Sequence, residues 1–353
     1  MNQGRQPFNL DEHFRRLYAG VPRECAFRAR TVAGLRTWQR RLRARLAAAL
    51  GLATMQKDLV SHRPRAERAG SADVGDYVRE RWYLWVEPDV PLPLWVLLPK
   101  GRSRGRPLVL TPHGHTHPNA YVGLPRNHED VPADDPGRGG PAVDAVREGY
   151  VTIAPTVRGF GETARAEDLA EGRNSSCRVQ LMHGLLVGRT PIGERVWDVS
   201  RVIDWALTQF DVDPERIAVT GNSGGGTVSL FAGAMDERIA VTVPSCYFST
   251  FVGSVGSIAH CDCNYVPGIL QLGEMYEVAG LIAPRPFCAL TGREDAIFPV
   301  EEAKKAFSQL QHIYAVAGAP KNCELYVGEG GHRYYGEGAW PFIRKWFRHV
   351  PTR

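Results

Sequence analysis

Short apolar runs alternate with amphipathic segments along most of the chain, and this alternation constrains the fold more than any other feature. Strands buried on both faces are predicted for the runs PLVLTP, YVTIAP, RIAVTG, IAVTVP, PFCALTG and CELYV. A helix between two of them, GERVWDVSRVIDWALTQF, places Val196, Val199 and Ile203 on one face. We expect an α/β fold, with a mostly parallel sheet of about eight strands covered by helices on both faces. Functional residues should then lie at the carboxyl ends of the strands.

The chain divides into two unequal parts by this pattern. Residues 1–72 show helices and loops without strand signals, which predicts an N-terminal helical extension that packs on or caps the core. Residues 73–353 are expected to form the catalytic core, and its runs RERWYLWVE and LPLWVLLP, separated by PDVP, predict a hairpin. Two insertions, near 162–193 and 246–283, leave from strand ends and can line a pocket.

Composition excludes several classes of partner. The 353 residues carry a net charge of +5 at pH 7, with a cluster of arginines at 36–45 that we interpret as a solvated helix face. No nucleic-acid-reading motif accompanies it, so no nucleic acid is expected as partner. The sequence contains no apolar stretch of about 18 residues, so no membrane span is predicted. Seven scattered cysteines and a start without an apolar run favour reduced thiols and a cytoplasmic location. A homo-oligomer is compatible with all of this.

The strongest chemical motif is GNSGG, residues 221–225, between the predicted strand RIAVT and a helix that begins near Gly224. This G-x-S-x-G pattern is typical of a nucleophile elbow, a turn so tight that only glycine fits two residues before and after the serine. A phosphate loop of the Walker type would require a lysine that is absent. Ser223 is therefore the predicted nucleophile, with a glycine-rich turn as the structural alternative.

A serine nucleophile needs a base, and the base needs an acid to orient it. Downstream of Ser223, His332 lies in the loop GEGGHRYYG directly after a predicted strand, whereas His312 and His349 lie within helices and are expected to pack or face solvent. Asp295 follows the strand PFCALTG, and its neighbour Glu294 would point the other way. We predict His332 as base and Asp295 as acid, in the chain order Ser, Asp, His.

Two groups of side chains raise the alternative of metal binding. His113, His115 and His117 alternate in LTPHGHTHPN, and an extended strand would place them on one face, as a metal-dependent hydrolase would require. Cys261 and Cys263 form a C-x-C, which is poor spacing for a zinc knuckle. For the cysteines, packing along a pocket wall is the favoured interpretation, with a redox role as a further alternative. The histidine stretch is interpreted as a strand end whose backbone acts, which leaves the imidazoles of His115 and His117 to line the pocket. We predict no metal and no other cofactor.

Taken together, the motifs TPHGH, VRGFGET, GERVWDVSRVIDW, GNSGGG, IAPRPFCALTGREDAIFP and GEGGHRYYG resemble the α/β-hydrolase superfamily. Within it, the sequence is most similar to acetyl xylan esterase-like and dienelactone hydrolase-like enzymes. The resemblance covers residues 80–350 and implies a Ser223–His332–Asp295 triad without a cofactor. It also implies that the substrates are mostly carboxylic esters, often acetyl groups on sugars.

The same resemblance implies an oxyanion hole. One N–H would come from Gly224, after the nucleophile, and the other from His115 or, as the weaker choice, Thr116, after the strand PLVLTP. Further candidates for the substrate pocket are Arg158, His260, Tyr265 and Tyr334. For Arg158 and Tyr334, packing or a salt bridge is an equally good interpretation.

The sequence thus predicts a serine esterase that forms an acyl-enzyme, with a small acetyl-type ester, on a carbohydrate or another small molecule, as substrate. A peptidase, amidase or C–C bond hydrolase could use the same triad, although no β-propeller or acidic pair supports a dipeptidyl peptidase. A metal-dependent hydrolase and a non-catalytic binding protein of the same fold are alternatives from other classes. The acyl group, the alcohol and the oligomeric state are not determined by the sequence.

Overall fold

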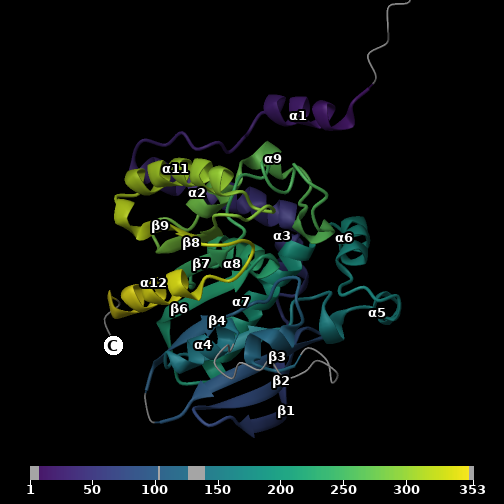
Figure 1. Ribbon diagram of the computed structural model, residues 1–353, viewed down its shortest axis with the longest axis vertical. Helices are drawn as coiled ribbons and strands as arrows, with labels where there is room; N and C mark the ends of the chain where they lie inside the picture. Colours follow the sequence, from purple (N-terminus) through teal and green to yellow (C-terminus); the bar gives the residue numbers. More distant parts are fainter. Residues whose placement is uncertain (1–7, 102–103, 126–139, 350–353) are drawn as a thin grey trace, which may run out of the picture.

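One nine-stranded sheet runs through the molecule in the order β1-β2-β3-β5-β4-β6-β7-β8-β9 (Figure 1). The computed structural model describes residues 8–101, 104–125 and 140–349. The first three strands and β5 pair in antiparallel fashion, whereas β5, β4 and β6 to β9 are parallel. The strands are β1 (Arg65–Asp73), β2 (Tyr77–Glu87), β3 (Val90–Pro99), β4 (Arg106–Leu110), β5 (Val151–Pro155), β6 (Val212–Asn222), β7 (Val241–Ser245), β8 (Phe287–Gly292) and β9 (Cys323–Gly328).

Helices cover both faces of this sheet. The longer ones are α1 (Leu10–Gly20), α2 (Val32–Leu50), α6 (Cys177–Leu186), α7 (Pro191–Gln209), α8 (Gly224–Met235), α11 (Val300–Val316) and α12 (Gly336–His349). The shorter ones are α3 (Leu52–Asp58), α4 (Pro141–Arg147), α5 (Ala166–Ala170), α9 (Ile269–Leu272) and α10 (Met275–Gly280), with 3-10 turns η1 (Pro118–Val122), η2 (Gly161–Thr163), η3 (Asp262–Asn264) and η4 (Pro320–Asn322).

The core explains why the parallel strands are continuously apolar. Ile217 and Val219 of β6 pack into a large cluster with α2, α7 and α8, while Ala218 between them packs into a second cluster with α12. Successive side chains of a strand point to opposite faces, so a strand covered on both sides has no solvent-facing position. The predicted α/β architecture is confirmed, as is the antiparallel hairpin of β2 and β3.

The prediction that residues 1–72 contain no strand is wrong. β1 pairs with β2 at the edge of the sheet, so the expected boundary between residues 72 and 73 falls inside a strand. Its sequence, RAERAGSAD, is polar, and eight of its nine residues are exposed. An edge strand that buries no face has no reason to alternate apolar and polar residues, so periodicity could not reveal it.

The rest of the N-terminal segment joins the core to different extents. α2 buries Leu35, Trp38, Leu42, Leu46 and Leu50 against α7, α8 and α11. α1 has no buried residue and lies at the far end of the molecule from β1 (Figure 1). None of the described helices is both long and apolar enough to cross a membrane.

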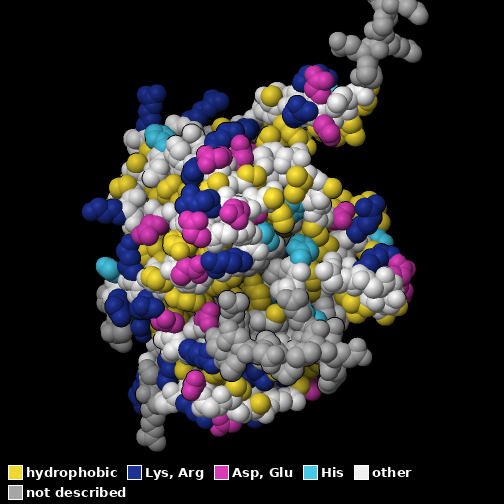
Figure 2. All heavy atoms as spheres, viewed as in Figure 1, with side chains coloured by type: hydrophobic (Ala, Val, Ile, Leu, Met, Phe, Trp, Pro, Cys, Tyr) yellow, Lys and Arg dark blue, Asp and Glu magenta, His cyan; other side chains and the backbone are white. Residues whose placement is uncertain are grey.

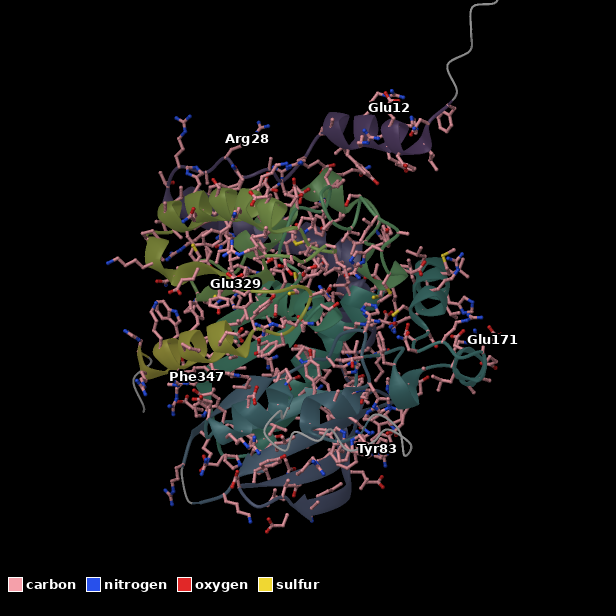
Figure 3. The ribbon with its side chains drawn as sticks, viewed as in Figure 1. Glu12, Arg28, Tyr83, Glu171, Glu329 and Phe347 are labelled. Atoms are coloured by element: carbon pink, nitrogen blue, oxygen red, sulfur yellow. The ribbon has the colours of Figure 1, made fainter. Side chains whose placement is uncertain are left out.

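Both predicted insertions leave from the carboxyl ends of strands. The first follows β5 and contains η2, α5 and α6, with Glu171 at its outer edge (Figure 3). The second follows β7 and contains η3, α9 and α10. η3 and α6 contact each other, so the two insertions meet on the side of the sheet where functional residues are expected.

Candidate active site

Ser223 occupies a sharp turn between β6 and α8. Its φ is 58°, a left-handed conformation that a residue other than glycine adopts only at a cost in free energy. A Cβ atom at Gly221 or Gly225 would lie 2.2 Å or 2.1 Å from the carbonyl oxygen of Pro112. The two glycines are therefore required, because the loop after β4 crosses directly over the elbow.

Asp295 and His332 meet beside this turn. Asp295 follows β8, and His332 lies in the loop after β9, which begins at Glu329 (Figure 3). Nδ1 of His332 lies 2.8 Å from Oδ2 of Asp295, while Oδ1 of Asp295 accepts hydrogen bonds from the N–H groups of Ile297 and Phe298. Glu294, by contrast, has an exposed side chain.

The environment keeps Asp295 ionised. Burial acts to raise the pKa of its carboxyl group, but the hydrogen bond and charge of His332 and the two backbone N–H groups outweigh burial and lower the pKa. Nε2 of His332 is buried and has no hydrogen-bond partner within the described ranges. An imidazole whose Nδ1 is held by a carboxylate and whose Nε2 is free can accept a proton from a serine hydroxyl.

The loop that carries His332 is anchored by the end of β7. Ser245 Oγ and Cys246 Sγ both donate hydrogen bonds to the carbonyl oxygen of Arg333, at 3.3 Å and 3.2 Å. Burial raises the pKa of the Cys246 thiol to about 12, so it remains a protonated donor. Sequence reasoning missed both residues, although their position after a buried strand was a signal.

A cavity of about 540 Å³ opens over the serine. Ser223 and His332 line it together with three of the predicted pocket and oxyanion residues, His115, His260 and Tyr334. Histidine side chains are visible beside hydrophobic ones near the middle of the face in Figure 2. Tyr265 does not line this cavity. It lines another, beside α1, and its hydroxyl donates to the carbonyl oxygen of Val255.

Arg158 does not contact the cavity either. Its guanidinium makes two hydrogen bonds to Asp198 of α7, at 2.8 Å and 2.6 Å, and one of 2.6 Å to Glu87 at the end of β2. Burial acts to lower its pKa, but the charges of Asp198, Glu194 and Glu87 outweigh burial and raise it. Of the two interpretations of Arg158, the structure shows the salt bridge.

The three histidines of LTPHGHTHPN point to three different places. Buried His113 donates from Nδ1 to the carbonyl oxygen of Gly114, and its Nε2 accepts the N–H of Val157, so both nitrogens are occupied. Burial lowers its pKa to about 3, which keeps it neutral. His117 caps η1, with Nδ1 accepting the N–H of Asn119. An extended strand would have placed them on one face, but β4 ends at Leu110 and the chain turns afterwards.

The same loop also packs against the turn that carries the serine. A Cβ atom at Gly114 would lie 3.1 Å from the backbone nitrogen of Gly224, so the two segments are in contact. Within the described ranges, the N–H groups of His115 and Gly224 donate no hydrogen bond to the protein. Two unpaired N–H groups beside a nucleophile are the donors that an oxyanion hole requires.

Tyr121 was not predicted, yet it ties the two segments together. Its buried hydroxyl accepts a hydrogen bond from the N–H of Asn222, at 3.0 Å, and lies near the backbone of Gly114. Burial raises its pKa to about 12, so the phenol stays neutral. It lies in η1, shortly after the motif TPHGH, but no spacing in the sequence marks it as part of the site.

The strand order, the strained serine between strand and helix, and the Asp–His pair at the ends of the next strands define the α/β-hydrolase fold. Residues 186–256 match the family model described as "Glucuronyl esterase, fungi". The chain is 30% identical over 168 residues to "Putative hydrolase YtaP" of Bacillus subtilis (strain 168), covering 46% of this chain. It is 36% identical over 116 residues, 31% of this chain, to a 4-O-methyl-glucuronoyl methylesterase of Cerrena unicolor.

These matches span 56% and 24% of the lengths of the two relatives. Solved structures extend the likeness over nearly the whole chain. A "putative acetyl xylan esterase" from Bacteroides fragilis superimposes with a TM-score of 0.74 at 19% identity, covering 97% of this chain and 86% of that one. A glucuronoyl esterase from Solibacter usitatus gives 0.62 at 14% identity, covering 92% and 98%. At sequence identities this low, the structural likeness shows a shared fold and no more.

Proposed function

We propose that this chain is a serine hydrolase that cleaves carboxylic esters of carbohydrates. The observation that carries the proposal is the strained Ser223 sharing a cavity with His332, whose Nδ1 is held by Asp295. Esterases of sugars also recur among the proteins that the chain resembles in sequence and in fold. No Asp, Glu, Lys or Arg is among the described residues that line the cavity, which suits a neutral ester group.

The proposed reaction uses these residues in turn. The Ser223 hydroxyl attacks the ester carbonyl and gives its proton to Nε2 of His332, while Asp295 stabilises the imidazolium through Nδ1. The N–H groups of Gly224 and His115 hold the oxyanion, each contributing about 2.7–4 kcal/mol to the transition state. The alcohol leaves with the proton from His332. Water then attacks the acyl-enzyme by the same route and releases the acid.

A fluorophosphonate probe tests the nucleophile directly. Wild type should be labelled at Ser223 and should hydrolyse 4-nitrophenyl acetate. Ser223→Ala should lose labelling, and its turnover should fall by about 10⁶-fold. Ser71→Ala, on the exposed edge strand β1, is the matched control and should behave as wild type. Retained labelling and turnover in Ser223→Ala would refute the serine mechanism.

The substrate class needs a second measurement. We propose a small acetyl-type acyl group on a sugar, and the enzyme should be assayed on acetylated xylo-oligosaccharides, methyl glucuronate and an aminoacyl amide. Turnover of the acetylated sugar above the other two is expected. Preference for methyl glucuronate would place the sugar on the acyl side of the bond, and preference for the amide would replace the esterase proposal while leaving the triad intact.

A further inference from the structure

Three cysteines and one histidine converge beside the candidate active site. Cys177 begins α6 in the first insertion, Cys261 and Cys263 lie at η3 in the second, and His115 belongs to the loop after β4. The three sulfur atoms and one ring nitrogen of His115 all lie within 4.8 Å of one another. Cys177 and Cys263 are buried, and the other two are half-buried.

The spacing of these atoms matches a tetrahedral metal centre. Zinc bonds of about 2.3 Å to sulfur and about 2.0 Å to nitrogen place sulfur atoms about 3.8 Å apart, and sulfur and nitrogen about 3.5 Å apart. Cys263 Sγ and Cys177 Sγ lie 3.5 Å and 4.0 Å from Nε2 of His115, and Cys261 Sγ lies 3.4 Å from Cys263 Sγ. The remaining pairs of ligand atoms lie within 4.8 Å of one another, so closing the tetrahedron requires shifts of at most about 1 Å.

The charges around the cluster fit thiolates bound to a cation. Three thiolates and one Zn²⁺ carry a net charge of −1. Buried Arg195 of α7 places Nη2 3.5 Å from Cys177 Sγ, and its guanidinium also donates to the carbonyl oxygen of Arg158. Nδ2 of Asn264 lies 3.7 Å from Cys263 Sγ. Thiolate sulfurs that accept N–H bonds beside one balancing cation are typical surroundings of a metal site.

We propose that Cys177, Cys261, Cys263 and Nε2 of His115 bind one Zn²⁺. Each thiol loses its proton on binding, so three protons are released to solvent. Four protein ligands leave no open position, so the ion is structural and takes no part in ester cleavage. The objection to a C-x-C zinc knuckle does not apply here, because two ligands come from distant segments.

The ion would act by positioning. It would join α6 and η3 to the loop whose His115 N–H faces the oxyanion, and it would fix Cys261, which lines the cavity. His115 would thus serve two partners, with its ring on the metal and its backbone N–H on the substrate. Loss of zinc should then lower kcat while changing KM only slightly.

Metal content of the purified full chain tests the site. After expression in zinc-supplemented medium and dialysis, elemental analysis should find one zinc per chain, and X-ray absorption should show three sulfur ligands and one nitrogen ligand. Cys263→Ser should lose the zinc. Cys323→Ser is the matched control, because its thiol is also buried but lies outside the cluster, and it should keep the full content.

Cobalt substitution keeps the proposal testable if Cys263→Ser does not fold. Co²⁺ in the wild-type chain should give the intense visible bands of a tetrahedral thiolate site, together with sulfur-to-cobalt charge transfer. Wild type without zinc, an adventitious ion that Cys263→Ser retains, or a Cys261–Cys263 disulfide found by mass spectrometry would each overturn the proposal. None of these outcomes bears on labelling of Ser223, so the two proposals fail separately.

Discussion

Asp295 shows how one residue sets the chemistry of another. Its Oδ1 is held by two backbone N–H groups, which leaves Oδ2 to fix the orientation of His332. Because its pKa is lowered, its stabilising contribution is present above the ordinary carboxyl pKa and is lost only as the pH falls through the lowered value. No loss of activity caused by Asp295 is therefore expected in the neutral range.

Replacing the acid by its amide should disable the base. In Asp295→Asn, the amide can donate to Nδ1 and favour the wrong imidazole tautomer, so kcat on 4-nitrophenyl acetate should fall by about 10⁴-fold. Glu294→Gln is the matched control, since this neighbouring carboxylate is exposed, and its activity should be unchanged. A loss confined to Glu294→Gln would reassign the acid.

At the level of elements, Arg158 links a parallel strand, a helix and a strand of the antiparallel hairpin. It follows β5 and binds Asp198 on α7 and Glu87 at the end of the antiparallel hairpin strand β2. Arg189 also donates to Glu87, so two buried carboxylates depend on a small number of cations. Buried ion pairs add little net stability to the folded state, but removing one partner leaves the other charge buried without compensation.

Arg158→Met should therefore lower the free energy of unfolding by about 3–5 kcal/mol. Urea denaturation followed by circular dichroism measures this difference. Arg16→Met, which removes an exposed guanidinium bound to the likewise exposed Glu12 on α1, should cost about 0–1 kcal/mol. A substrate role for Arg158 would instead appear as a raised KM with unchanged stability, which is the opposite of our expectation.

On the scale of the whole molecule, residues 32–50 belong to the core rather than to a separate extension. α2 packs with α7, α8 and α11 in one cluster, and Gln39 donates to the carbonyl oxygens of Gly280 and Ala283. Loss of contacts on α2 should thus destabilise the whole sheet. α1, without buried residues, should contribute little.

Two leucines in the N-terminal segment separate these roles. Leu46→Ala removes a fully buried side chain and should lower the free energy of unfolding by about 2–5 kcal/mol in a single cooperative transition. Leu17→Ala, on α1 and 51% exposed, should change it by less than about 0.5 kcal/mol. Equal effects, or two separate transitions, would indicate that the N-terminal segment folds as a unit of its own.

The sequence by itself determined the features that local rules control. Apolar runs predicted β4 to β9, because strands that bury both faces, such as β5, β7 and β8, cannot be polar. GNSGG predicted the elbow, because the turn tolerates only glycine around Ser223. The order of Asp295 and His332 after their strands predicted that they would meet. Each of these inferences needs only neighbours in the chain and one topological rule.

The features that depend on residues distant in the sequence were decided only by the tertiary structure. β1 escaped prediction because an edge strand buries nothing, and Arg158 could not be assigned until Asp198 and Glu87 were seen around it. The alternating histidines separated because the chain turns after Leu110. His115 joined three cysteines brought from two insertions, a contact that no spacing in the sequence encodes.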